Sequence, residues 1–228
     1  KKKKQKKKKN FITLQNKLKK KKKDLDQQLF AKEQLLAQSQ ASERTFQSLL
    51  SQLKAQHRAN ENEIFSIEQT IRQRLENQNK LKDLEANGET ILSWPTNGRY
   101  ITARFRDPSY PYRHVFEHNA IDIRARQGTP LKAAASGYVA RTKKCSLASC
   151  YAYTLIVHSN GLSTLYGHMN TISVNEGQFV SRGQVIGTSG AAPGTIGAGP
   201  FTTGPHLHFE VRKDGIPVNP LLYLIKDY

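Results

Sequence analysis

Several absences limit what this 228-residue chain can be. Nowhere does an apolar run reach about 18 residues, so no segment is expected to cross a bilayer as a helix. No signal peptide is recognisable, because the lysine-rich start is not followed by a long apolar core. Proline and glycine are missing until Gly88, although they recur often afterwards. The chain is therefore expected to have a helical first part and a differently built second part.

Acidic residues are also missing from the start of the chain, where fourteen lysines precede Asp24. The net charge of +18 is thus concentrated in residues 1–23, a lysine-rich basic segment. Such a segment can meet anionic wall polymer, anionic lipid or nucleic acid, or it can be a solvated charge run. Nucleic-acid binding is not expected, since no aromatic residues interleave the lysines and no known reader accompanies them.

Residues 11–88 are predicted to be helical, because good helix formers dominate and apolar residues recur at spacings of three and four. This pattern is typical of a coiled coil whose apolar stripe packs against another helix. Two arrangements remain open: a helical hairpin that turns near His57–Asn62, or a single long helix. Asn87 and Gly88 are predicted to end the helix, and residues 89–98 to form a linker. The stripe comprises Leu14, Leu18, Leu25, Leu29, Phe46, Leu50, Leu53, Ile64, Ile67, Ile71 and Leu75.

Residues 99–228 have the sequence pattern of an all-β domain, since short runs of β-branched and aromatic residues alternate with glycine-containing turns. The predicted fold class is therefore α+β multidomain, with a helical coiled coil followed by a domain of antiparallel sheet. Cys145 and Cys150 flank the predicted turn between two strands. A disulfide there suits an oxidising, exported setting; a pair of free thiols is the alternative.

Metal-binding residue types gather in two short motifs of this β domain. His206 and His208 are two apart on a predicted strand, so their side chains point to one face. His118 and Asp122 are four apart and also share a face if that segment is extended. A catalytic zinc takes about three protein ligands of these types and leaves one position for water. A spare histidine beside the metal can then transfer protons.

An ordered series of motifs makes the region from about 95 to 224 resemble the M23 peptidases, also called the LytM or lysostaphin-type domain. The resemblance implies a twisted antiparallel sheet flanked by a smaller one, with a zinc site in a groove. It implies His118, Asp122 and His208 as zinc ligands and His168 and His206 as catalytic histidines. The motifs are His118-x-x-x-Asp122, Gly128-Thr129-Pro130, Gly161 to His168, Gly177-Gln178, Gly183 to Gly187, and Thr203 to Glu210.

The resemblance also implies a substrate, since M23 peptidases cleave stem peptides or peptide cross-links of bacterial peptidoglycan. The order of coiled coil and β domain is similar to EnvC-like hydrolases and hydrolase activators. We therefore expect an extracytoplasmic zinc (Zn²⁺) endopeptidase, with its helical part anchoring or regulating it and with no signal or membrane anchor expected within residues 1–228. The alternative is a non-catalytic activator that recruits another wall hydrolase while the coiled coil binds a membrane divisome complex. Glu210 is expected to contact the sheet or a metal ligand.

Overall fold

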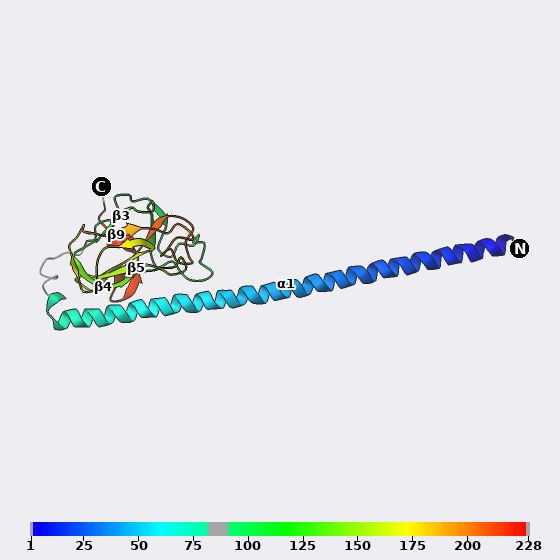
Figure 1. Cartoon of the computed structure of the whole chain (residues 1–228), viewed down its shortest axis with the longest axis horizontal. Coiled ribbons are helices and arrows are strands. Elements are labelled where there is room, and N and C mark those ends of the chain that lie inside the picture. Colours follow the sequence, from blue (N-terminus) through cyan, green and yellow to red (C-terminus); the bar gives the residue numbers. More distant parts are fainter. Residues whose placement is uncertain (1, 82–90, 227–228) are drawn as a thin grey trace. The chain divides into compact units, whose positions relative to one another are not determined.

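The computed structural model describes residues 2–81 and 91–226 and divides into two compact units, Lys1–Ala55 and Gln56–Tyr228. Helix α1 spans Lys2–Asn77 and contributes to both units. Figure 1 draws it without interruption from its blue end onward. The single long helix is thus the arrangement adopted, and the hairpin near His57–Asn62 is not. The lack of proline and glycine explains this, since no residue there breaks the helical hydrogen-bond ladder.

Helix α1 ends at Asn77, and residues 80 and 81 are again helical where this described stretch of the chain stops. Residues 78 and 79 form a turn, in which the N–H of Asn79 donates to the carbonyl of Glu76 at 2.9 Å. Asn79 has φ 57°, in the left-handed region that asparagine enters more readily than most residues. Sequence reasoning overlooked this asparagine as a stop signal. The predicted end at Asn87 and Gly88 lies outside the described residues.

In the unit Lys1–Ala55 the apolar stripe faces solvent, with Leu25, Leu29 and Phe46 more than half exposed. Heptad spacing remains the basis for expecting a coiled coil in this part, and the coiled coil stays a prediction. Among the described residues, no helix is both long and apolar enough to cross a membrane.

The second unit contains two antiparallel sheets, which confirms the predicted fold class. The large sheet has the order β1-β2-β10-β6-β5-β4-β8, with β11 also paired to β10. The small sheet has the order β3-β9-β7. The large-sheet strands are β1 (Ile101–Ala103), β2 (Ile121–Arg124), β4 (Gly137–Lys143), β5 (Tyr153–Val157), β6 (Leu162–Gly167), β8 (Phe179–Val180), β10 (His206–Lys213) and β11 (Ile216–Val218). The small-sheet strands are β3 (Pro130–Lys132), β7 (Met169–Ile172) and β9 (Val185–Ser189), and a 3-10 helix η1 (Pro220–Leu222) follows β11.

One hydrophobic core joins the two sheets. Leu131 and Ile186 of the small sheet and Leu207 and Phe209 of β10 are all fully buried in this cluster. Because strand side chains alternate, the residues of β10 between and beside them point to the opposite face. That second face carries His206, His208, Glu210 and Arg212. The core therefore fixes the strand whose other side holds the histidines.

The C-terminal part of α1 packs on the large sheet within the second unit. Ile64 and Leu75 are buried against Leu155, Val157 and Leu165 of β5 and β6. This corrects the expectation that the apolar stripe packs against another helix, since between residues 64 and 75 its partner is a sheet. Periodicity shows which helix face is apolar but does not identify the surface that covers it.

The described part of the predicted linker, residues 91–98, and the cysteine pair both form part of the β domain. Leu92 is buried in the core and bridges to Leu224, so the chain joins the fold before residue 98. Cys145 and Cys150 form a disulfide across the connection between β4 and β5, as favoured from the sequence. The pairing shortens the free loop next to Tyr151, whose ring reaches the histidine cluster.

Candidate metal centre

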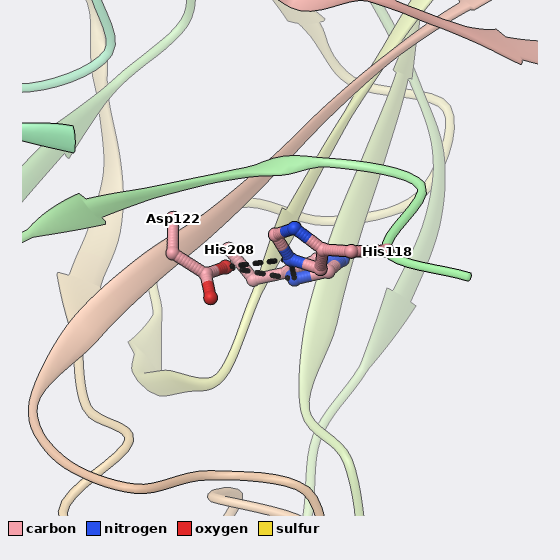
Figure 2. Close-up of side chains that lie close together, drawn as sticks. All are labelled: His118, Asp122 and His208. Carbon is pink, nitrogen blue, oxygen red and sulfur yellow. Dashed lines mark hydrogen bonds and ion pairs between the residues drawn. The ribbon is translucent and has the colours of Figure 1, made fainter. Parts of the chain in front are cut away.

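Strand pairing brings the two histidine-bearing motifs together. In the register of the large sheet, His208 on β10 lies opposite Asp122 on β2 and opposite Gly167 on β6. His118 precedes β2 and is 1% exposed, and Asp122 is 7% exposed. Three side chains predicted as ligands therefore occupy one nearly dry volume, and all three are labelled in Figure 2.

The ligand atoms of these three residues have nearly equal mutual distances. Nε2 of His118 lies 3.1 Å from Oδ1 of Asp122 and 3.4 Å from Nδ1 of His208. Nδ1 of His208 lies 3.1 Å from the same Asp122 oxygen. In a tetrahedral zinc site with ligand atoms about 2.0 Å from the metal, neighbouring ligand atoms lie about 3.3 Å apart. The spacing therefore fits zinc.

Hydrogen bonds on the far side of each ring determine which nitrogen faces the centre. Nδ1–H of His118 donates to the carbonyl oxygen of Arg104 at 2.9 Å, which leaves the Nε2 lone pair pointing at Asp122. Nε2 of His208 lies 3.3 Å from Oε1 of Glu210, so the proton belongs on that nitrogen and the Nδ1 lone pair faces inward. Three electron-rich atoms therefore converge, and such a set is stable only around a cation or a shared proton.

The pKa shifts of His208 and Asp122 in this metal-free cluster also indicate that it favours a bound positive charge. Burial lowers the pKa of His208, but hydrogen bonds to Asp122 and Glu210 outweigh it and raise this pKa to about 10. Burial likewise raises the pKa of Asp122, but the hydrogen bonds to His118 and His208 outweigh it and hold it well below its usual range. Without a metal, a proton on His208 thus supplies the missing charge.

His168 and His206, predicted as catalytic, lie beside the three ligand candidates. The rings of His168 and His206 are 4.8 Å apart, and His168 is 5.6 Å from the ring of His208. Each donates its Nδ1–H to a backbone carbonyl, His168 to Ala198 at 2.6 Å and His206 to Gly204 at 2.7 Å. Burial lowers the pKa of both rings, so both are neutral near pH 7.

The second nitrogen of His206 is the distinctive atom of this pair. Its Nε2 is buried, has no hydrogen-bond partner among the described residues, and lies 3.6 Å from Oδ1 of Asp122. Its lone pair is therefore free to accept a proton or a ligand. The arrangement can hold a divalent metal and present neutral imidazoles to whatever binds beside it.

The glycine before His168 is explained by local packing. A Cβ on Gly167 would lie 1.9 Å from the hydroxyl oxygen of Tyr151, so only glycine leaves room for that ring. The Tyr151 ring in turn contacts His168 edge-on at 4.9 Å. His168 itself has φ 55°, a left-handed conformation that few non-glycine residues adopt, although histidine enters it more readily than most. Gly167 and the ring of Tyr151 thus fix the position of the His168 imidazole.

An aromatic wall, which was not foreseen from the sequence, and a segment of α1 complete the surroundings. Tyr110 stacks on His118 at 4.2 Å, and His57 of α1 stacks on Phe116 at 4.0 Å. A cavity of about 340 Å³ lies among Gln56, His57, Asn60, Glu61 and Ile64 of α1, the aromatic residues Tyr110, Phe116 and Phe201, and the site residues His168, His208 and Glu210. His57 was expected to be a coiled-coil residue; its place beside the cavity depends on tertiary packing that periodicity does not reveal.

Two further histidines stay outside the cluster. His158 is buried, with Nδ1 2.9 Å from the carbonyl of Ser136 and Nε2 2.8 Å from the hydroxyl of Thr164. Both of its ring nitrogens are therefore occupied within the fold, which is a structural role. His114 is exposed.

Comparison with known proteins agrees with this geometry. Residues 116–220 match the model of peptidase family M23. This part of the chain is an M23 peptidase domain. The match includes every ligand and catalytic candidate, from His118 to His208.

Individual relatives are similar over the same part of the chain. DD-carboxypeptidase/endopeptidase Mpg of Neisseria meningitidis is 38% identical over 122 residues, covering 53% of this chain and 26% of that protein. Peptidoglycan DD-endopeptidase ShyA of Vibrio cholerae is 39% identical over 144 residues, covering 60% and 31%. Stage II sporulation protein Q of Bacillus subtilis is 36% identical over 109 residues, covering 46% and 36%. The chain spans less than a third of the length of the first two relatives.

Proposed function

We propose that this protein is a zinc-dependent endopeptidase that cleaves peptide stems or cross-links of bacterial peptidoglycan. The observation that carries the proposal is the buried set of His118, Asp122 and His208, whose three ligand atoms lie 3.1–3.4 Å apart. Two neutral imidazoles beside this set provide the proton acceptors that peptide hydrolysis needs. A purely structural zinc site would have a fourth protein ligand instead of an open side.

His118, Asp122 and His208 would hold the metal. When bound, zinc supplies Lewis-acid activation of water and of the scissile carbonyl. His206 presents a buried, unpaired Nε2 and is suited to accept the proton of the attacking water. His168, whose Nδ1–H donates to the Ala198 carbonyl, also has an unprotonated Nε2, so it can return a proton to the leaving amine once the proton removed from water has passed to it. The single imidazolium ion formed in this transfer also stabilises the developing oxyanion.

The substrate class is suggested by the relatives and by the walls of the cavity. Two relatives are named as DD-endopeptidases, and one of these names includes peptidoglycan, which favours a peptide cross-link as the cleaved bond. Tyr110, Phe116 and Phe201 give the cavity apolar walls, and Glu117 and Lys143 provide charged groups at it. An extracytoplasmic location accords with this substrate and with the Cys145–Cys150 disulfide.

The helical part is proposed to regulate access to the site. Residues of α1 from Gln56 to Ile64 line the same cavity as His168 and His208, so a substrate in that cavity must share it with the helix. A partner, such as a membrane divisome complex, that draws α1 away would enlarge the cavity. The substitution Ile64→Lys in the full chain is expected to loosen this segment and raise the rate of cleavage; an unchanged rate would argue against regulation by α1.

The test of the proposed activity uses the full chain with zinc and purified cross-linked peptidoglycan. Mass spectrometry of the soluble products is expected to show new peptide termini and thereby identify the bond. His208→Ala is expected to lose zinc and activity together, whereas His206→Ala is expected to lose activity and keep zinc. Absence of cleavage for several wall types, with zinc bound, would contradict the proposal.

The second candidate is a non-catalytic activator that recruits another wall hydrolase. It is favoured by the shared cavity, which places α1 beside the histidines, and by a relative named for sporulation rather than for a peptidase activity. Under this proposal the chain yields no peptide termini alone but increases cleavage by another wall hydrolase added to the assay. The same mass-spectrometric assay therefore separates the two candidates.

A further inference from the structure

A row of alternate residues on β10 leads from the metal centre toward α1. Nε2 of His208 lies 3.3 Å from Oε1 of Glu210, and Oε2 of Glu210 lies 2.6 Å from Nη1 of Arg212. Glu210 is 3% and Arg212 is 2% exposed. In so dry a place a hydrogen bond to a charged group is strong, and each member fixes the orientation of the next. His208 is therefore held by Glu210, and Glu210 by Arg212.

Two carboxylates of α1 hold the far side of Arg212. Nη1 of Arg212 lies 3.3 Å from Oε2 of Glu61, and its Nε lies 3.5 Å from Oε2 of Glu68. The Glu68 side chain is fully buried, and its other oxygen accepts a hydrogen bond from Arg72 at 3.1 Å. The ion pairs that connect these helix carboxylates to the metal centre pass through Arg212 and Glu210. Glu61 also lies close enough to His208 for their charges to interact.

Charge favours an association between α1 and a metal-loaded site. Glu61, Glu68 and Arg72 together bring one net negative charge beside the row on β10. They also share the guanidinium of Arg212, which leaves the Glu210 carboxylate more available to accept from His208. Both effects make His208 a better ligand for a cation, because a partner that accepts the ring proton increases the basicity of the opposite nitrogen.

We propose that Glu61 and Glu68 are positioning residues for the metal ligand His208, acting through Arg212 and Glu210. The α1 segment 61–72 and the metal then bind the domain cooperatively. The coupling is reciprocal: if the helix carboxylates raise metal affinity by some factor, metal raises the affinity for the helix segment by the same factor. This inference rests on metal binding by His118, Asp122 and His208.

The test measures Zn²⁺ affinity of the full chain at pH 8 by competition with a chromophoric chelator. The double variant Glu61→Gln, Glu68→Gln is expected to bind Zn²⁺ about tenfold more weakly than wild type, at the low end of effects from residues that support ligands. Glu76→Gln, an exposed carboxylate on the same helix, is the matched control and is expected to bind like wild type. With Co²⁺ in place of Zn²⁺, the visible absorption of the double variant is expected to shift as His208 reorients.

Hydrogen exchange of the backbone amides of residues 61–72 provides the reciprocal readout. Added Zn²⁺ is expected to slow this exchange in wild type and to have a smaller effect in the double variant. Affinities within twofold of each other, with equal protection of the helix, would overturn the coupling and leave the metal site intact. A wild-type chain that binds no Zn²⁺ would instead overturn the proposed function. If a variant that carries Glu68→Gln does not fold, the single variant Glu61→Gln provides the test, because the Glu61 side chain is partly exposed. A Zn²⁺ affinity of Glu61→Gln equal to that of wild type would again refute the coupling.

Discussion

Nε2 of His208 lies 3.3 Å from a carboxylate oxygen of Glu210, while Nδ1 of the same ring faces Asp122. The ring therefore has one acceptor on each side, and Glu210 determines which nitrogen carries the proton. A histidine that is held in this way presents its lone pair to a metal without first reorienting. Glu210, which is not itself a ligand candidate, therefore controls how well His208 can bind a metal.

Replacing Glu210 tests this control directly. Glu210→Gln removes the charge that accepts from His208, so the affinity for zinc is expected to fall by about 10- to 100-fold. Chelator competition measures the affinity, and thermal unfolding of the metal-free proteins checks that both are folded. Glu117→Gln is the matched control, because that carboxylate lines the cavity but is exposed and pairs with Arg106. Equal zinc affinity for the Glu210 variant and wild type would contradict the assignment.

Histidines proposed as metal ligands and histidines proposed as catalytic residues should give different results when metal content and cleavage are both measured. His206→Ala removes the buried, unpaired Nε2 and leaves the three ligand atoms in place, so zinc is retained while cleavage falls by about 100-fold or more. His118→Ala removes a ligand atom, so zinc and cleavage are lost together. Atomic absorption after dialysis reports the metal. Loss of zinc in the His206 variant would assign this residue to the ligand set.

Gly167 should be intolerant of a side chain for a reason visible in the packing. The new Cβ of Gly167→Ala would meet the hydroxyl of Tyr151 at 1.9 Å and the ring carbon that bears it at 2.7 Å. Relieving this clash moves a ring that contacts His168, so we expect a loss of about 1–3 kcal/mol in stability together with reduced cleavage. Thermal and urea unfolding measure the first effect. The control is Gly98→Ala, whose Cβ would make only one contact, at 3.8 Å, and a comparable loss there would remove the steric explanation.

The ligand candidates could be predicted because they depend on local regularities. Alternation on one strand places His206 and His208 on a common face, and the short spacing from His118 to Asp122 limits how far apart those two can be. The pairing of β2 with β10, which joins the two motifs, was available only through the resemblance to a known family. The helical first part and the β character of the second part followed from breaker residues and periodicity for the same local reasons. The choice between one helix and a hairpin stayed open, and the pair of antiparallel sheets came from the family resemblance.

What the sequence could not show depends on long-range contacts. The stripe at Ile64 and Leu75 is equally suited to a helix or a sheet, and the structure shows that it packs on β5 and β6. Glu61 and Glu68 look like ordinary helix carboxylates until Arg212, more than 140 residues later, is found between them and Glu210. The alternate residues His208, Glu210 and Arg212 are in the sequence only a weak sign of such a chain of contacts. They became informative when the structure placed Glu61 and Glu68 beside Arg212.

Glu61 should also make the stability of the metal-free chain depend on pH. Burial, together with the nearby charge of Glu210, raises the pKa of Glu61 to about 7, while Arg212 and His208 oppose the shift. The folded chain therefore holds a proton between about pH 4.5 and pH 7 that the unfolded chain has released. The stability contributed by this proton is present at low pH and is lost as the pH rises through 7.

Melting temperatures of the metal-free full chain at pH 5 and pH 8 measure this contribution. Wild type is expected to lose more stability than Glu61→Gln over this interval, because glutamine keeps the size of the side chain but cannot release a proton. Other titrating groups are common to both proteins, so the difference between the two profiles isolates Glu61. The same comparison for Glu76→Gln is expected to give the wild-type profile, since that carboxylate is exposed. Parallel profiles for wild type and Glu61→Gln would show that the buried position of Glu61 leaves its ionisation unaffected, and the ion pair with Arg212 would then be the dominant influence on it.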